Sequence, residues 1–142
     1  MISKEILKKV MESQREELLG KGENEVERDK LDEIKLLPGF ALLISGIRRC
    51  GKSTLLRQMI KGNKKIPYFN FEDTRLTGFS VKDFNRLMEV FSESYENIEE
   101  YYFDEIQNIE GWEIFIRSLL DRKKKVLITG SNASLLSKEL GT

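Results

Sequence analysis

The sequence predicts an α/β protein built on one parallel sheet, and three observations support this. Short apolar runs of strand length alternate along the chain with segments whose apolar residues recur at helical spacing. Residues 46–53, which read GIRRCGKS, fit the pattern G-x-x-x-x-G-K-[ST] and stand between such a run and such a segment. A later apolar run, 101–103, ends in two acids, Asp104 and Glu105. Strands that alternate with helices form parallel β/α units with right-handed connections.

The composition favours one folded unit in a reducing compartment. The 142 residues suffice to bury a core. The 24 Lys and Arg balance the 24 Asp and Glu, so no overall field attracts nucleic acid or an anionic membrane. A nucleic-acid partner is thus unsupported by charge, although local basic clusters leave it open. One cysteine excludes an internal disulfide. Because no run of 18 apolar residues occurs, we expect a soluble cytoplasmic protein without a membrane partner.

The first residues predict a helical arm that precedes the core. Ser3 is a plausible N-cap, and apolar residues from Ile6 to Leu19 mark one helical face that ends near Gly20. A second short amphipathic segment follows and stops before Pro38. We expect residues 1–36 to form an arm that packs on the core or on a partner, and residues 37–142 to form the core.

The core elements follow in order. Pro67 cannot donate to a β-ladder, so it belongs at the start of its strand or on a sheet edge. Ser80 with Asp83 resembles a capping box ahead of a helix. We predict strands at 40–45, 66–71, 100–103 and 126–129, and helices after residue 52, at 84–95, at 112–120 and from Ser134.

The glycine-rich segment is suited to bind a polyphosphate. Its glycines let successive backbone N–H groups face one point, and the following helix directs its positive end there. Lys52 would reach the β- and γ-phosphates, and the Ser53 hydroxyl would bind Mg²⁺. Arg48 and Arg49 could touch phosphate or a partner, with solvent-facing positions as the alternative. The residues expected to surround the nucleotide are Gly46, Ile47, Arg48, Arg49, Cys50, Gly51, Lys52, Ser53 and Thr54.

The two acids that follow the third strand supply the second half of this site. A phosphate loop needs a carboxylate on a neighbouring strand tip to hold Mg²⁺ and its waters, and Asp104 fits that role. Glu105 points elsewhere and could polarise the water that attacks the γ-phosphate. Ser131 and Asn132 end the fourth strand, where a polar side chain could orient that water. Alternatively they only turn the chain or cap the next helix.

These segments resemble a known family. Residues 46–56, 102–107 and 128–136, together with Trp112, are similar to AAA+-superfamily P-loop ATPases of archaea and bacteria that carry a C-terminal nuclease-like domain. The resemblance implies a three-layer P-loop NTPase sandwich with sheet order 5-1-4-3-2. It implies Lys52 and Ser53 on phosphate and metal, and Asp104 on Mg²⁺. It also implies Glu105 as base, with Ser131 and Asn132 as a sensor.

The chain departs from that family at its end. In members of that family the chain continues past the position that corresponds to Thr142, into a Gly-Arg segment, a fifth strand and the C-terminal domain. We therefore expect the core to be truncated, with the first strand at a sheet edge unless the arm covers it. An arginine that assists hydrolysis would then come from a second copy or another partner.

Two functions from different classes remain. The first is an Mg²⁺-dependent ATPase, weak in this truncated form, with Lys52 and Glu105 in the catalytic set. The second is a protein-interaction module that is gated by ATP and turns over negligibly. A GTPase is less favoured, because the chain has neither an Asn-Lys-x-Asp stretch nor an Asp-x-x-Gly segment after a strand.

Overall fold

The computed structural model describes residues 2–20, 35–45, 52–62 and 65–131. The glycine-rich segment 46–51, the second amphipathic segment at 21–34 and the helix expected from Ser134 lie outside these residues. Helix α1 (Lys4–Gly20) comes first, and Ser3 caps it as predicted: its hydroxyl accepts from the Ile6 backbone N–H at 3.2 Å.

Four parallel strands form the sheet, as the sequence predicts. They are β1 (Ala41–Ser45), β2 (Tyr68–Asn70), β3 (Glu100–Asp104) and β4 (Lys125–Gly130). Their order is β1-β4-β3-β2, which matches the 1-4-3-2 part of the order that the resemblance implies. The chain therefore places β4 between the strand that leads into the glycine-rich segment and the strand that ends in two acids.

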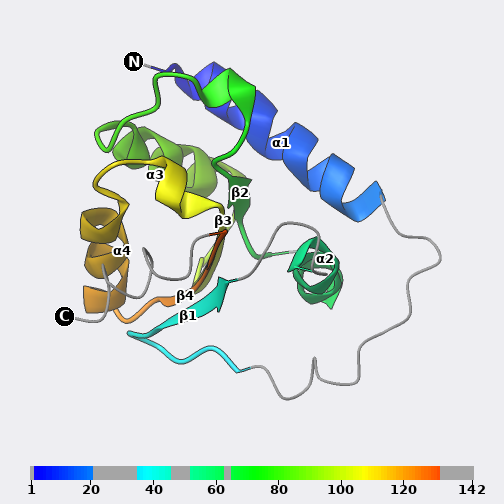
Figure 1. Ribbon diagram of the computed structural model, residues 1–142, viewed down its shortest axis with the longest axis vertical. Helices are drawn as coiled ribbons and strands as arrows, with labels where there is room; N and C mark the ends of the chain where they lie inside the picture. The colour runs from blue at the N-terminus through cyan, green and yellow to red at the C-terminus, as the bar shows by residue number, and fades with distance from the viewer. Residues whose placement is uncertain (1, 21–34, 46–51, 63–64, 132–142) are drawn as a thin grey trace.

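Helices cover both faces of this sheet and make three layers. Helix α2 (Lys52–Gly62) lies on one face, and α3 (Asp83–Ser94) and α4 (Trp112–Asp121) lie on the other (Figure 1). Side chains alternate along β3 accordingly: Tyr101 and Phe103 pack with α3 and α4, whereas Tyr102 packs with α2. Because Asp104 follows in the same alternation, its carboxylate belongs to the α2 face.

The predicted start of α3 is present in modified form. The Asp83 carboxylate accepts from the Ser80 backbone N–H at 2.9 Å, which is the reciprocal half of a capping box. The Ser80 hydroxyl also points to this carboxylate, at 3.4 Å, and so does not cap the helix itself. Two short 3₁₀ helices, η2 (Thr74–Leu76) and η3 (Ile106–Asn108), lie in the connections that follow β2 and β3.

Helix α1 packs in cis, along the edge of the sheet that β2 forms (Figure 1). Its first half places Leu7, Val10 and Met11 in the core on the α3 side, and Leu18 in its last turns joins the cluster on the α2 side. The helix thus closes the β2 edge and leaves β1 as the other edge of the described sheet. Helix α1 does not cover β1. The expected boundary between an arm at residues 1–36 and a core at residues 37–142 remains a prediction.

The entry to β1 is a tight turn. Leu37 O accepts from Phe40 N at 3.1 Å, and Gly39 between them has a φ of 80°. Proline at the second position and glycine at the third are typical of a type II turn. Gly39 N donates to Lys124 O at 3.0 Å, so the turn is fixed to the start of β4.

Among the helices of the described segments, none combines the length and apolar character that crossing a bilayer requires.

Candidate functional site

Most of the predicted site residues that the structure describes meet at the end of the sheet formed by the carboxyl ends of its strands. The strands are parallel, so β1, β3 and β4 all end there, and the register sets Ser45 beside Gly130. Asp104 is the last residue of β3 and Glu105 follows it, and Ser131 follows β4. Lys52 begins α2, with Ser53 and Thr54 in its first turn. Their side chains lie outside the described residues, as do Gly46, Ile47, Arg48, Arg49, Cys50, Gly51 and Asn132.

The Asp104 carboxylate is held by a hydroxyl at each oxygen. Tyr68, on the neighbouring β2, donates its phenol to Oδ2 at 2.8 Å. Thr129, on β4, donates its hydroxyl to Oδ1. All three side chains are buried, with 5% of Asp104 exposed. Burial first, and then the charge of Asp104, raise the pKa of the Tyr68 phenol well above its ordinary value. The phenol therefore stays protonated and able to donate.

Thr129 also ties Asp104 to the residue that follows it. The Glu105 backbone N–H donates to the Thr129 hydroxyl oxygen at 3.0 Å. A hydroxyl has one proton, and because its oxygen accepts from Glu105, that proton is available for Asp104. The direction of both hydrogen bonds is thus fixed, and one side chain of β4 aligns the backbone at the end of β3.

Glu105 turns its carboxylate away from Asp104. Its backbone lies in the left-handed region, with φ 54° and ψ 44°, which is rare for a residue other than glycine or asparagine. Its carboxylate contacts the Ser131 hydroxyl, at 2.9 Å from each oxygen, and accepts from Gln107 Nε2 at 2.7 Å. Only 4% of Glu105 is exposed. The hydrogen bonds described here thus direct the two adjacent carboxylates to different side chains: Asp104 to Tyr68 and Thr129, and Glu105 to Ser131 and Gln107.

A small polar cavity adjoins Asp104 on the α2 face. It measures about 140 Å³ and lies between α1, α2, β2 and the end of β3. Its lining includes Gln14 and Glu17 from α1, Arg57 from α2, Tyr68 and Asp104. Arg57 is 4% exposed, so a buried guanidinium stands near the two carboxylates. Helix α1 therefore contributes to the surroundings of the candidate site.

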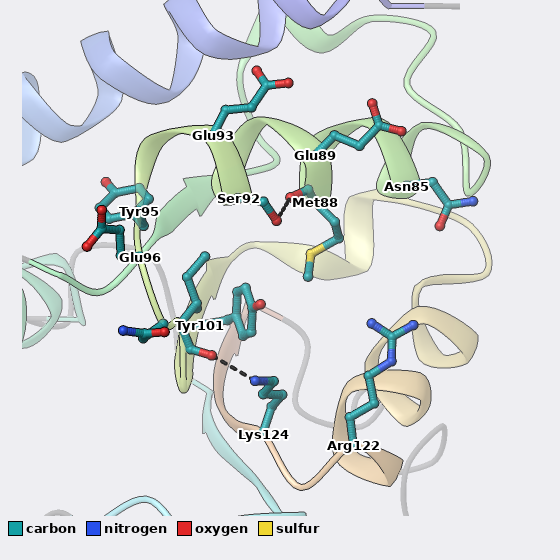
Figure 2. A pocket seen from close by; sticks show the side chains of 12 residues that line it. Asn85, Met88, Glu89, Ser92, Glu93, Tyr95, Glu96, Tyr101, Arg122 and Lys124 are labelled. Atoms are coloured by element: carbon teal, nitrogen blue, oxygen red, sulfur yellow. Dashed lines mark hydrogen bonds between the residues drawn. The ribbon is translucent and has the colours of Figure 1, made fainter.

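A larger hollow of about 820 Å³ lies elsewhere, between α3 and the turn from α4 into β4. Figure 2 shows Met88 and Tyr101 inside it, with Arg122 and Lys124 on the side opposite α3. Lys124 donates to Ile98 O at 2.8 Å. This is where β3 and β4 begin. Ligands of open parallel sheets bind at the carboxyl ends, so this hollow is distinct from the candidate site.

Sequence reasoning missed Tyr68, Thr129 and Gln107. Thr129 had one signal: it is a hydroxyl residue in the apolar run 126–129, and the structure buries it fully. Tyr68 had none, because tyrosine is common in strands. Gln107 is placed by the turn that Glu105 makes, which sequence spacing does not reveal.

Comparison of the sequence with known proteins identifies a family and two relatives. A sequence model described as AAA domain matches residues 38–142. An uncharacterised protein of Methanocaldococcus jannaschii is 41% identical over 112 residues, which are 78% of this chain and 25% of that protein. An uncharacterised protein of Haemophilus influenzae is 37% identical over 112 residues, or 72% of this chain and 28% of that protein. The chain thus spans about a quarter of the length of these curated relatives. No solved structure matches it. With the family match extending from the turn before β1 to the last residue, the chain belongs to the AAA domain family of P-loop ATPases.

Proposed function

We propose that this chain binds ATP with Mg²⁺ and hydrolyses the β–γ bond, with Glu105 as general base. Membership of the AAA domain family supports a nucleotide-binding, ATPase-like function. The observation that carries the finer proposal is the division of labour at the end of β3. Asp104 is held by two hydroxyls on the sheet, whereas the next residue directs its carboxylate to Ser131 at the end of β4. Adjacent acids with separate partners suit a metal ligand and a base.

ATP would be bound by residues 46–54, ahead of and within the first turn of α2. The free N–H groups and the dipole at a helix N-terminus favour phosphate. In this proposal Lys52 contacts the β- and γ-phosphates, and Gly46 and Gly51 allow the backbone to surround them. The amino end of α2 lies at the edge where β1 ends, which is where the phosphates would be required.

The oxygen ligands in this region fit Mg²⁺. Mg²⁺ keeps several of its waters and is usually held by one or two carboxylates together with substrate phosphates. Asp104 and the Ser53 hydroxyl would hold the ion. When bound, Mg²⁺ would neutralise charge on the phosphates.

Glu105 would accept a proton from the attacking water. Its carboxylate is buried beside Ser131, so the proton is removed at a shielded position rather than in bulk solvent. Ser131 would position the carboxylate, and Asn132 would orient the water. The roles of Lys52 and Asn132 rest on the sequence, whereas that of Ser131 rests also on its contact with Glu105.

One observation favours the second function, an interaction module that binds ATP with negligible turnover. In the present arrangement the Glu105 carboxylate is already occupied by Ser131 and Gln107. Turnover requires that this carboxylate also accept from the attacking water, at a remaining lone pair or in place of one of these partners. A chain in which these partners leave no room for that water with ATP bound would use nucleotide only to stabilise a binding surface.

The experiment compares ATP turnover of the wild-type chain with that of Glu105→Gln. Glutamine keeps the size of glutamate and one of its two acceptor oxygens but is not a base. We expect turnover to fall by about 10²–10⁴-fold, the range that general bases contribute, while ATP affinity stays within about twofold. Glu110→Gln is a matched control, because Glu110 is exposed in the nearby turn after η3. GTP in place of ATP tests the choice of nucleotide.

The outcomes separate the two functions. Turnover that persists in Glu105→Gln would show that Glu105 is not the base. Tight ATP binding without turnover in the wild type would favour the interaction module. A chain that binds no nucleotide would contradict both.

A further inference from the structure

We propose that Tyr68 is a positioning residue for the metal-binding carboxylate of Asp104, an inference that rests on the proposed function. The residue is on β2, outside both nucleotide-binding segments of the sequence. Its phenol reaches across to the tip of β3 and donates to Asp104 Oδ2 at 2.8 Å.

The phenol completes a clamp in which each carboxylate oxygen has a separate donor. Thr129 donates to Oδ1 from the strand on the other side of β3. A carboxylate bonded at one oxygen alone can rotate about that bond. One bonded at both oxygens, from two neighbouring strands, is held in a single orientation. The two hydroxyls therefore fix the plane of the Asp104 carboxylate before any ligand binds.

Tyr68 can act in this way because its own position is rigidly determined. The ring is 4% exposed and packs in the cluster under α2. Two residues further along β2, the Gln14 amide pairs with the backbone of Asn70, accepting from its N–H at 2.9 Å and donating to its carbonyl at 2.8 Å. Helix α1 thereby holds the short strand β2 in place. The strand that carries Tyr68 is thus held by the sheet on one side and by α1 on the other.

A fixed carboxylate matters more for Mg²⁺ than for most ions. Mg²⁺ requires near-octahedral geometry and gives up its waters reluctantly, so an acceptor that wanders loses contact with the ion or its waters. Removing a hydrogen-bonding partner of a metal-binding group typically lowers metal affinity about 10–100-fold. Tyr68 is such a partner for Asp104.

The test measures how strongly Mg²⁺ tightens ATP binding, as the ratio of the ATP Kd with EDTA to that with Mg²⁺. For Tyr68→Phe we expect this ratio to fall about tenfold or more, while the Kd in EDTA stays that of the wild type. Tyr101→Phe is the matched control: Tyr101 is also a buried sheet tyrosine, but it packs on the opposite face. Its ratio should not change.

A double-mutant cycle with Asp104→Asn shows whether the effect passes through Asp104. If it does, adding Tyr68→Phe to Asp104→Asn changes the ratio no further. A general disturbance of the fold would instead lower the EDTA affinity and add to the effect of Asp104→Asn. If Tyr68→Phe does not fold, Thr129→Val against Thr129→Ser tests the same clamp at the other oxygen.

The failures are distinguishable. A wild-type ratio well above one, with the same ratio in Tyr68→Phe, overturns the positioning role and leaves the proposed function intact. A wild-type ratio near one removes the metal role of Asp104 and this inference with it. A wild-type chain that binds no ATP removes the proposed function itself.

Discussion

At the scale of single residues, the most informative feature is that two neighbouring buried acids direct their carboxylates to different side chains. The left-handed backbone of Glu105 is what separates them. Such a conformation in a residue other than glycine costs on the order of 1–3 kcal/mol and persists where surrounding contacts enforce it. Here the enforcing contacts are identifiable: Thr129 holds the Glu105 N–H, and Asn108 donates to its carbonyl at 3.0 Å. This strained backbone conformation directs the Glu105 carboxylate toward the end of β4.

Ser131 should matter for the rate of hydrolysis and little for binding. Ser131→Ala removes the hydroxyl that lies 2.9 Å from both Glu105 oxygens, so the carboxylate proposed as the base is no longer held toward β4. We expect kcat to fall about tenfold or more with an unchanged ATP Kd, because the contact acts on the base and not on the nucleotide. Ser118→Ala, on α4, is the control. Unchanged kcat and Kd would return Ser131 to a structural role at the strand end.

The sequence predicts the site residues that belong to recognisable patterns and misses those that do not. Asp104 and Glu105 are predictable because two acids end an apolar strand downstream of a phosphate-loop pattern. Tyr68 lies thirty-six positions from Asp104, and only the sheet order brings the two together. That order came from the resemblance and not from periodicity. Contacts between strands distant in sequence are set by topology, which spacing alone does not encode.

At the scale of elements, α1 covers the β2 edge of the sheet and hydrogen-bonds backbone groups that another strand would otherwise pair with. An open strand edge presents unpaired N–H and C=O groups that invite pairing with another chain. The Gln14 amide satisfies both groups of Asn70, and Arg15 donates to Ile66 O at 2.7 Å. The amphipathic pattern predicts this helix and its cap at Ser3. Helical spacing places position 14 on the buried face with Leu7 and Leu18, but a glutamine there does not reveal that its amide pairs with a strand edge.

Asp73 links α1 at this edge to the connection after β2, and its ionisation makes the stability of the fold depend on pH. Its carboxylate accepts from Arg75 and from Gln14, and the Arg75 hydrogen bond is the main cause that lowers its pKa from 3.8 to about 2. A carboxyl with a lowered pKa in the folded state stabilises the fold above its unfolded pKa. That contribution is lost as the pH falls from about 4 toward 2.

We therefore expect Asp73→Asn to be less stable than the wild type at pH 7, with the difference shrinking between pH 4 and pH 2. Urea unfolding at several pH values measures it. Asp121→Asn, an exposed aspartate at the end of α4, serves as the control. A difference that stays constant down to pH 2 would mean that the charge of Asp73 contributes nothing at this junction.

At the scale of the whole molecule, the two edges of the described sheet are treated differently. Helix α1 closes the β2 edge, whereas β1 is the outer strand on the other side. Two large apolar side chains beside β1, Leu37 and Phe40, are 58% and 66% exposed. The equal numbers of acidic and basic residues give copies of the chain no net repulsion. Nothing in this charge balance opposes approach of a second copy.

Association between copies bears on a further requirement of the proposed hydrolysis, an arginine at the γ-phosphate. Such an arginine, in cis or from a neighbour, is worth about 10³–10⁵ in rate. Arg48 and Arg49 belong to the segment expected to surround the nucleotide, and Arg57 is buried under α1.

If a second copy supplies the arginine, dilute chain should hydrolyse ATP slowly, and turnover per chain should rise with concentration. Adding excess Lys52→Ala, which we expect to bind ATP poorly while keeping every arginine, should also raise the turnover of a fixed small amount of wild type. An equal mass of an unrelated globular protein controls for crowding. Turnover per chain that stays flat over a hundredfold range of concentration, with no response to Lys52→Ala, would show that the arginine does not come from a second copy.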